Sequence, residues 1–208
     1  MREILRFGLL LGLVCGISAG TLSAVFSRVA PLIKENERIE AIKKRKAVLP
    51  EAAVFEPVEK AERTVYIGLD ESGAPVGTAM AEAPRGYAGP IRMTIGIVGA
   101  GTEARLSGVA ISKLDQSETP GLGVKITRPA FLDMFKGLAA GDVALKSDGG
   151  QIDAITAATI SSRAVVNGVQ AGMTWYARNF PDGPEVPAGA GQAREESGAP
   201  VQGAGGAE

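Results

Sequence analysis

The feature that most constrains this chain is an uncharged apolar stretch near its amino terminus. Residues 7–27 contain no Asp, Glu, Lys or Arg and are rich in Leu, Val, Ile, Ala and Gly. A helix of that length spans roughly 30 Å, the thickness of the hydrocarbon core of a bilayer. We therefore expect a leader at residues 1–6 and a transmembrane helix at residues 7–28.

A cleaved signal peptide is the alternative for the same stretch, because Arg2 and Arg6 precede it as a signal's basic region would. We favour a retained anchor, since the run is longer than the apolar part of a signal peptide and no clean Ala-x-Ala site follows it. The flanking charges also predict an orientation. More Lys and Arg follow the stretch than precede it, which by itself places the carboxy-terminal bulk in the cytoplasm.

The segments on either side of the main body have distinct compositions. Residues 33–46 alternate charged residues with Ile33, Ile39 and Ile42, which predicts a solvated helix continuing from the membrane. Two prolines at residues 49–57 end that helix, so we assign residues 29–57 to a stalk and linker. Residues 181–208 are dominated by Gly, Ala and Pro, and we expect a disordered tail there.

The remaining sequence predicts an α+β domain with a small, mostly antiparallel sheet and packed helices. Short β-branched runs at residues 64–69, 76–81, 91–98 and 109–114 are separated by turn residues, which is typical of strands. We expect a short helix at 129–138 and a longer one at 160–180. The longer helix has one apolar stripe with helical spacing, formed by Ser162, Val166, Val169, Met173, Tyr176 and Phe180.

Composition excludes several kinds of chemistry. The chain contains no histidine and one cysteine, Cys15, so histidine-based nucleophile pairs, thiolate zinc sites and iron–sulfur clusters are ruled out. Lys and Arg total 22 against 23 Asp and Glu, so there is no overall basic field to bind nucleic acid. We expect neither an independent catalytic site nor a metal site. Any redox function would need an organic cofactor.

One glycine pattern imitates a nucleotide-binding motif. Gly99, Gly101 and Ala104 follow a predicted strand with the spacing of a dinucleotide-binding fingerprint. That fingerprint requires a helix next, whereas another strand-like run follows here. We therefore interpret the segment as a β-hairpin turn.

Three loops are candidate ligand-binding segments. Residues 86–91 place Tyr87 among small residues, where it could line a pocket or only begin a strand. Residues 115–123 contain glycines that would let the backbone approach a planar ligand, although a tight turn would also explain them. Residues 147–162 lead into the long helix, whose amino-terminal N–H groups favour a phosphate beside Thr156 and Thr159. An ordinary helix cap by Thr159 or Ser161, with nothing bound, is the alternative.

Together and in this order, the loops resemble a known family. Gly-Tyr-x-Gly-Pro-Ile, then Glu-Thr-Pro-Gly-Leu-Gly, then Asp-x-x-Thr-x-Ala-Thr is similar to the FMN-binding domain of the G subunit of Rnf-type electron transport complexes. The related C subunit of sodium-pumping NADH:quinone oxidoreductases has the same pattern, but the length of this chain is more like that of the Rnf protein. The resemblance extends from the anchor to about Phe180 and implies an FMN-binding domain at residues 58–180.

The resemblance implies a covalent flavin. In the family, the FMN phosphate is esterified to the last hydroxyl residue of the third motif, which here is Thr159. The residues implied to surround the flavin are Tyr87, Glu118, Thr119, Gly121, Leu122, Gly123, Thr156 and Ala158. Ala157 stands where the family has glycine. Because alanine resists positive φ, we expect Ala157 to be helical or extended, or recognition by the attaching enzyme to be weakened.

The function implied is that of a membrane-anchored electron carrier in an ion-translocating ferredoxin:NAD+ (NADH) oxidoreductase complex. Its implied partners are the other subunits of that complex, membrane lipid, and a flavin transferase that uses FAD and magnesium. Such a transferase acts outside the cytoplasmic membrane, so the resemblance places the flavin domain on the periplasmic side of the inner membrane. We give this more weight than the charge count, because the leader is very short and the stalk carries both signs of charge. The alternatives are the quinone-reductase protein and a membrane-anchored scaffold without flavin.

Overall fold

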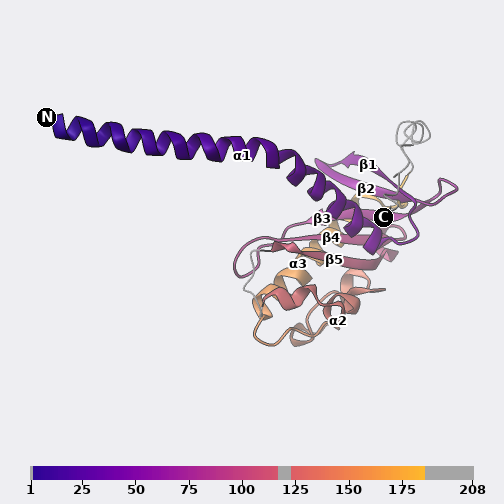
Figure 1. Cartoon of the computed structure of the whole chain (residues 1–208). Helices are drawn as coiled ribbons and strands as arrows, with labels where there is room; N and C mark the ends of the chain where they lie inside the picture. Colours follow the sequence, from indigo (N-terminus) through magenta and orange to yellow (C-terminus); the bar gives the residue numbers. More distant parts are fainter. Residues whose placement is uncertain (1, 117–122, 186–208) are drawn as a thin grey trace, which may run out of the picture. The chain divides into compact units, whose positions relative to one another are not determined.

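The computed structural model describes residues 2–116 and 123–185 (Figure 1). The chain divides into two compact units, Met1–Lys43 and Lys44–Glu208. The first unit is a helix, and the second contains the sheet and the remaining helices. The tail expected at residues 181–208 lies outside the described residues from residue 186 onward.

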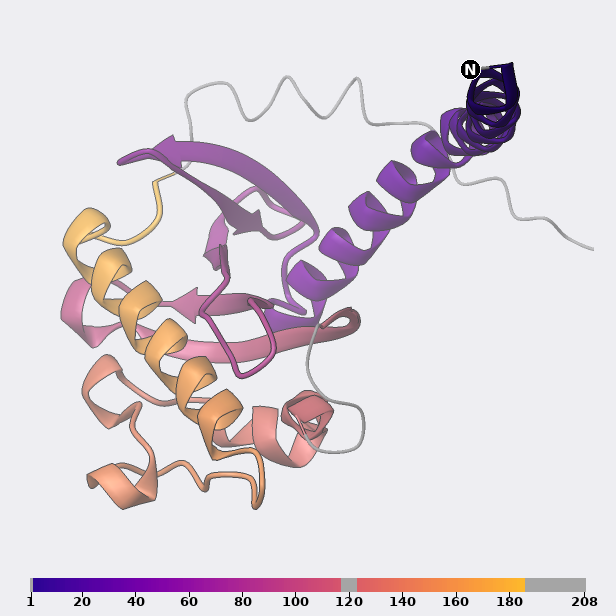
Figure 2. The same ribbon diagram turned by 90° about the vertical axis from the view of Figure 1, so that its left-hand side faces the viewer.

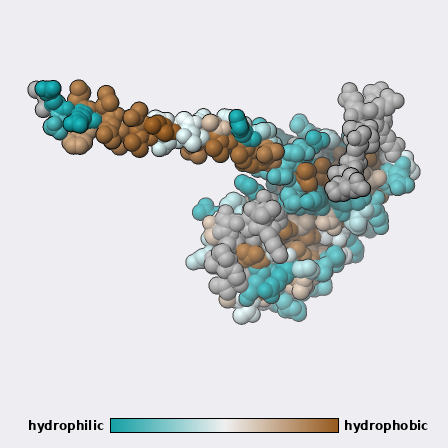
Figure 3. Space-filling model, in the orientation of Figure 1, coloured by the Kyte–Doolittle hydropathy of each residue, from teal (hydrophilic) through white to brown (hydrophobic). Residues whose placement is uncertain are grey.

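The amino-terminal helix α1 (Arg2–Val48) is 47 residues long and unbroken, although Pro31 lies inside it. Its amino-terminal part is apolar over a long stretch, shown in brown in Figure 3. Within the described ranges, α1 is the one helix long and apolar enough to cross a membrane. The expected transmembrane helix and the helical part of the stalk are therefore one continuous helix, which ends shortly before Pro50.

Five antiparallel strands form one sheet in chain order. They are β1 (Val54–Lys60), β2 (Arg63–Leu69), β3 (Pro75–Glu82), β4 (Ile91–Val98) and β5 (Arg105–Gln116). This confirms the predicted α+β class. The first strand was not predicted, and the domain boundary expected at residue 58 falls inside it. Its Pro57 is compatible with a strand because β1 lies at the edge of the sheet.

The connection between β4 and β5 is a hairpin turn, as expected. A single 3₁₀ turn, Gly101–Glu103, separates the two strands, which pair with each other. No helix of the dinucleotide-binding type follows the glycines, because β5 begins at Arg105. The predicted helix at 129–138 is shorter than expected: α2 (Pro129–Leu132) passes into a 3₁₀ turn, Asp133–Phe135. Gly137, with φ of +78°, takes a left-handed conformation just after it and ends the helical segment.

Helix α3 (Thr159–Asn179) packs across one face of the sheet, against β3 and β4 (Figure 2). Met93, Ile95 and Ile97 alternate along β4 and belong to the same buried cluster as this helix. The six residues of the predicted stripe are all buried: Ser162, Val166, Val169, Met173, Tyr176 and Phe180. The helix and its inward face were therefore predicted correctly.

The carboxy-terminal end of α3 is fixed by Tyr176. Its hydroxyl donates a hydrogen bond to the carbonyl oxygen of Gly99 at 2.9 Å, and its ring stacks on Phe180 with 5.0 Å between ring centroids. Burial raises the pKa of the Tyr176 hydroxyl. This contact ties the end of the helix to the β4–β5 turn.

The opposite face of the sheet is covered by the end of α1 and the residues after it. Val48, Leu49 and Ala52 form a second buried cluster with Ala79 of β3. The sheet has a glycine, Gly96, beneath these residues. A Cβ at this position would lie 2.8 Å from the carbonyl oxygen of Val48. The hydroxyl of Ser107 donates a 2.6 Å hydrogen bond to the same oxygen. A Cβ at Gly96 would also clash with the Ser107 hydroxyl, so the close approach of Val48 and Ser107 explains the glycine at position 96.

Candidate functional site

Helix α3 begins at Thr159, and the residue in the N-cap position is Ala158. A methyl side chain cannot accept a hydrogen bond, so Ala158 does not cap the helix through its side chain. Thr159 is exposed in the first turn, and Ser161 lies further along it. The alternative in which Thr159 or Ser161 occupies the N-cap position is therefore wrong.

A tight turn, residues 155–158, precedes α3. The backbone N–H of Ala158 donates to the carbonyl oxygen of Ile155 at 2.9 Å. The N–H of Ile155 donates to the hydroxyl of Ser162 at 3.1 Å, and this hydroxyl in turn donates to the carbonyl oxygen of Ala158 at 3.0 Å. The turn is thus bound to the first turn of the helix at both ends.

Ala157 is the third residue of this turn and has φ of +64°. Of the two alternatives expected for Ala157, the helical or extended conformation is therefore wrong, and weakened recognition by the attaching enzyme stays a prediction. A left-handed conformation favours glycine, and here the surrounding hydrogen bonds hold alanine in it. The backbone therefore takes the shape suited to the family's glycine, with strain that glycine would not carry.

A loop packed beside the turn carries two exposed ion pairs. The carboxylate of Asp153 lies 2.7 Å from the ammonium of Lys146. Asp148 contacts Arg163 of α3 with both carboxylate oxygens, at 2.6 and 3.4 Å. Leu145 and Ile152 form a parallel bridge that closes the loop. The second ion pair therefore connects this loop to the helix one turn beyond Thr159.

A cavity of about 240 Å³ opens beside Thr159. Its lining residues are Arg85, Thr159, Ile160, Arg163, Ala164 and Asn167. Two of them are arginines, and none of the described residues that line it is acidic. Together with the positive end of the helix dipole, this set of side chains fits an anionic group such as a phosphate next to the Thr159 hydroxyl.

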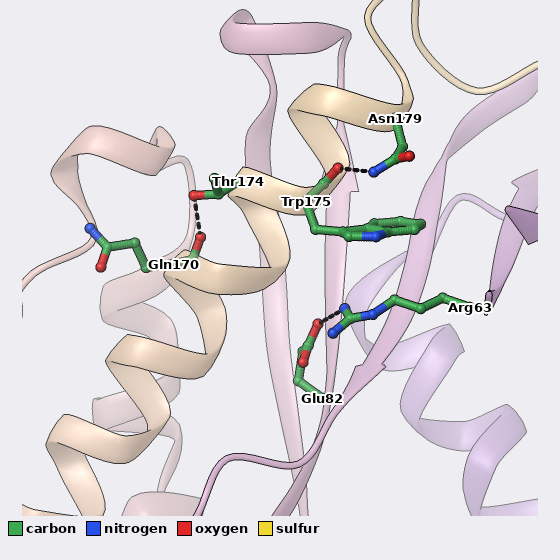
Figure 4. Close-up of polar contacts among 6 residues, drawn as sticks. All are labelled: Arg63, Glu82, Gln170, Thr174, Trp175 and Asn179. Atoms are coloured by element: carbon green, nitrogen blue, oxygen red, sulfur yellow. Dashed lines mark hydrogen bonds and ion pairs between the residues drawn. The ribbon is translucent and has the colours of Figure 1, made fainter. Parts of the chain in front are cut away.

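A larger hollow of about 600 Å³ shares Asn167 with the first and lies along the same helix. One end is formed by Arg63 and Glu82, whose side chains approach to 2.6 Å (Figure 4). The guanidinium of Arg63 also lies 5.3 Å from the ring centroid of Trp175. Figure 4 shows these three side chains gathered between α3 and the strands.

The structure places the predicted site residues in different surroundings. Thr159 lines the small cavity, whereas Thr156 and Tyr87 are exposed and are not among its lining residues. Ala158 and Gly123 are buried. The remaining predicted residues, Glu118, Thr119, Gly121 and Leu122, lie outside the described residues.

Sequence reasoning missed Arg85, Arg163 and Asn167. The sequence carries a signal for each arginine, although neither signal places Arg85 beside Thr159. Arg163 lies four residues after Thr159, so both side chains share one face of the helix. Arg85 directly precedes the Gly-Tyr-x-Gly-Pro-Ile motif. Asn167 continues the same helical face, four residues after Arg163.

Comparison with known proteins gives a consistent result. A family model described as an FMN-binding domain matches residues 86–174. A protein of Methanosarcina acetivorans, named as the G subunit of an ion-translocating oxidoreductase complex, is 32% identical over 182 residues, covering 84% of this chain and 95% of that protein. The protein of the same name from Stutzerimonas stutzeri is 33% identical over 188 residues, covering 81% and 78% of the two chains.

Among solved structures, the C subunit of the Na(+)-translocating NADH-quinone reductase from Parabacteroides distasonis is 25% identical, with a TM-score of 0.43. The match covers 54% of this chain and 62% of that one. The extent of the sequence identity to the Methanosarcina protein decides the relationship. The chain therefore belongs to the family of G subunits of ion-translocating oxidoreductase complexes.

Proposed function

We propose that this chain is a single-pass membrane protein that carries FMN covalently on Thr159 and transfers electrons within an ion-translocating oxidoreductase complex. The observation that carries the proposal is the position of Thr159, an exposed hydroxyl at the start of α3 in a cavity with two arginines. The match of residues 86–174 to an FMN-binding domain supports the identity of the cofactor.

FMN would supply the redox chemistry, since its ring accepts one or two electrons. The chain's own residues would hold and orient it. Thr159 fixes the phosphate at the start of the helix, and the hydrogen-bonded turn from Ile155 to Ala158 holds that hydroxyl in place. A chain with no histidine and one cysteine can in this way carry electrons without a metal cluster of its own.

Attachment requires a separate flavin transferase with FAD and magnesium. In this proposal the Thr159 oxygen would form the bond to the phosphorus that bears riboflavin, and AMP would leave from FAD. The hydroxyl proton passes to a base of the transferase. The turn before α3 supports this step because it leaves the Thr159 side chain exposed to an incoming enzyme.

The complex is a ferredoxin:NAD+ (NADH) oxidoreductase in this proposal, and the chain's partners are its other subunits and membrane lipid. The apolar part of α1 anchors the chain in the inner membrane, with the flavin domain on the periplasmic side. Protease added to intact spheroplasts tests this orientation. Removal of the domain supports it, and protection until the membrane is broken contradicts it.

The flavin attachment is tested on full-length protein purified from its own host and denatured in a gel. We expect a fluorescent flavin band in the wild-type protein and in Thr159→Ser, and none in Thr159→Ala. Thr174→Ala is the matched control, because Thr174 is an exposed threonine on the same helix that does not line the cavity, and it should keep the band. Fluorescence that persists in Thr159→Ala would move the attachment elsewhere, with Thr156 the next residue to test. A wild-type protein without flavin would favour the scaffold alternative.

A further inference from the structure

We propose that Arg85 and Arg163 are the phosphate-binding pair of this site, and that Arg163 exchanges its contact with Asp148 for the phosphodiester when FMN becomes bonded to Thr159. The inference rests on the proposed function and adds to it the residues that recognise the phosphate. It also makes the Asp148–Arg163 ion pair a feature of the protein before modification.

The first argument is position. Arg163 lies one helical turn after Thr159, and both line the same cavity. Arg85 reaches the cavity from the connection between β3 and β4. Its backbone is fixed there by a bridge to Pro90, and the N–H of Gly86 donates to the carbonyl oxygen of Gly89 at 2.8 Å. Two unrelated segments thus bring arginines to the cavity that Thr159 also lines.

The second argument is charge. Among the described residues that line the cavity, two are arginines and none is acidic, and the start of α3 adds to the positive field that the arginines produce. A phosphodiester bears one negative charge and two free oxygens. The planar guanidinium matches such oxygens in pairs, which favours arginine over lysine at a site that must orient a phosphate.

The third argument is the partner that Arg163 has in this structure. Both carboxylate oxygens of Asp148 contact its guanidinium, at 2.6 and 3.4 Å, while both side chains remain partly exposed. Exposed ion pairs contribute little to stability, so this contact can be given up readily. Asp148 therefore competes with the phosphate for Arg163, and the ion pair gives way when the phosphate arrives.

The test uses the full-length chain in detergent, made in a host without the transferase. Purified transferase, FAD and magnesium are added, and the initial rate of covalent labelling is followed by in-gel fluorescence. We expect Arg163→Gln and Arg85→Gln each to lower the rate about tenfold or more, and Arg163→Lys to recover part of it. Asp148→Asn should label at least as fast as the wild-type protein.

Lys146→Gln is the matched control, because Lys146 forms a 2.7 Å ion pair in the same loop but does not line the cavity. Its labelling rate should stay within twofold of the wild-type rate. Unchanged rates in both arginine variants would overturn the inference.

A second measurement separates phosphate binding from recognition by the transferase. Each variant is labelled to completion, and the ³¹P resonance of the phosphodiester is recorded. We expect it to move in Arg163→Gln and Arg85→Gln, to return toward the wild-type position in Arg163→Lys, and to stay in place in Lys146→Gln. Slow labelling with an unmoved resonance would assign the arginines to transferase docking and refute the inference. A wild-type chain that never becomes labelled would instead refute the covalent flavin itself.

Discussion

Replacing Ala157 with glycine tests whether the turn before α3 is strained. Ala157 has φ of +64° and an exposed side chain, so the substitution removes backbone strain without removing packing. A left-handed conformation costs a residue with a Cβ about 1–2 kcal/mol. Replacement by glycine removes this cost, but the greater conformational freedom of glycine in the unfolded chain offsets roughly 0.5–1 kcal/mol of the stabilisation. We therefore expect Ala157→Gly to raise the free energy of unfolding by roughly 0.5–1 kcal/mol.

For a domain of this size, that gain corresponds to a rise in Tm of about 2–3 °C. The chain's one tryptophan is the half-buried Trp175 on α3, so its fluorescence reports unfolding of the domain rather than of the membrane helix. Thermal unfolding of the unmodified full-length protein in detergent is the assay.

Ala154→Gly is the matched control, because Ala154 is exposed in the same segment but does not have positive φ. Glycine there only increases the freedom of the unfolded chain and should lower the free energy of unfolding by about 0.4–1 kcal/mol. Equal losses of stability in the two variants would refute the strain argument.

Two further predictions concern the packing on the two faces of the sheet. Gly96→Ala places a methyl group against Val48 and should lower the free energy of unfolding, measured by chemical denaturation, by about 1–3 kcal/mol. Gly108→Ala is the control, because its Cβ would lie 3.7 Å from Val48 and should lower the free energy of unfolding much less. Similar losses in the two variants would contradict the close-approach explanation. Burial raises the pKa of Tyr176 in the folded protein. The contribution of its neutral hydroxyl to the free energy of unfolding is therefore fully present below the pKa of the unfolded chain, near 10. That contribution is lost as pH rises through the higher pKa of the folded protein. Tyr176→Phe should therefore lower the free energy of unfolding at neutral pH by about 1 kcal/mol, because the hydrogen bond to Gly99 is lost. Above pH 10 the variant should lose stability less steeply than the wild-type protein. Parallel profiles of stability against pH would refute this.

The elements predicted well from the sequence are those whose burial is periodic. The stripe on α3 and the alternation along β4 leave clear patterns, because one side of each element faces a core. The strand β1 escaped detection for the opposite reason. It is an edge strand with Pro57 in its middle and charged residues on both sides, so little in its composition marks it as a strand.

The candidate site was predicted in part. Thr159 could be identified because its motif is local and precedes a recognisable helix. Arg85 could not be placed beside it, since 73 positions separate the two residues and only the fold of the β3–β4 connection brings them to one cavity. The helical or extended conformation predicted for Ala157 was wrong because alanine's preference for negative φ was applied to a residue whose backbone is set by the hydrogen bonds of its neighbours.

The double covering of the sheet restricts where other proteins can meet this domain. Helix α3 occupies one side of it, and Val48, Leu49 and Ala52 occupy the other, so the centre of the sheet has no bare side left for a redox partner. A partner of the described domain therefore meets the outer surfaces of these covering segments or an edge of the sheet, and not the sheet face itself. The flank of α3 with its two adjoining hollows is one such surface. The outer edge of β1 is another, and Pro57 there has no N–H with which to bind an added strand.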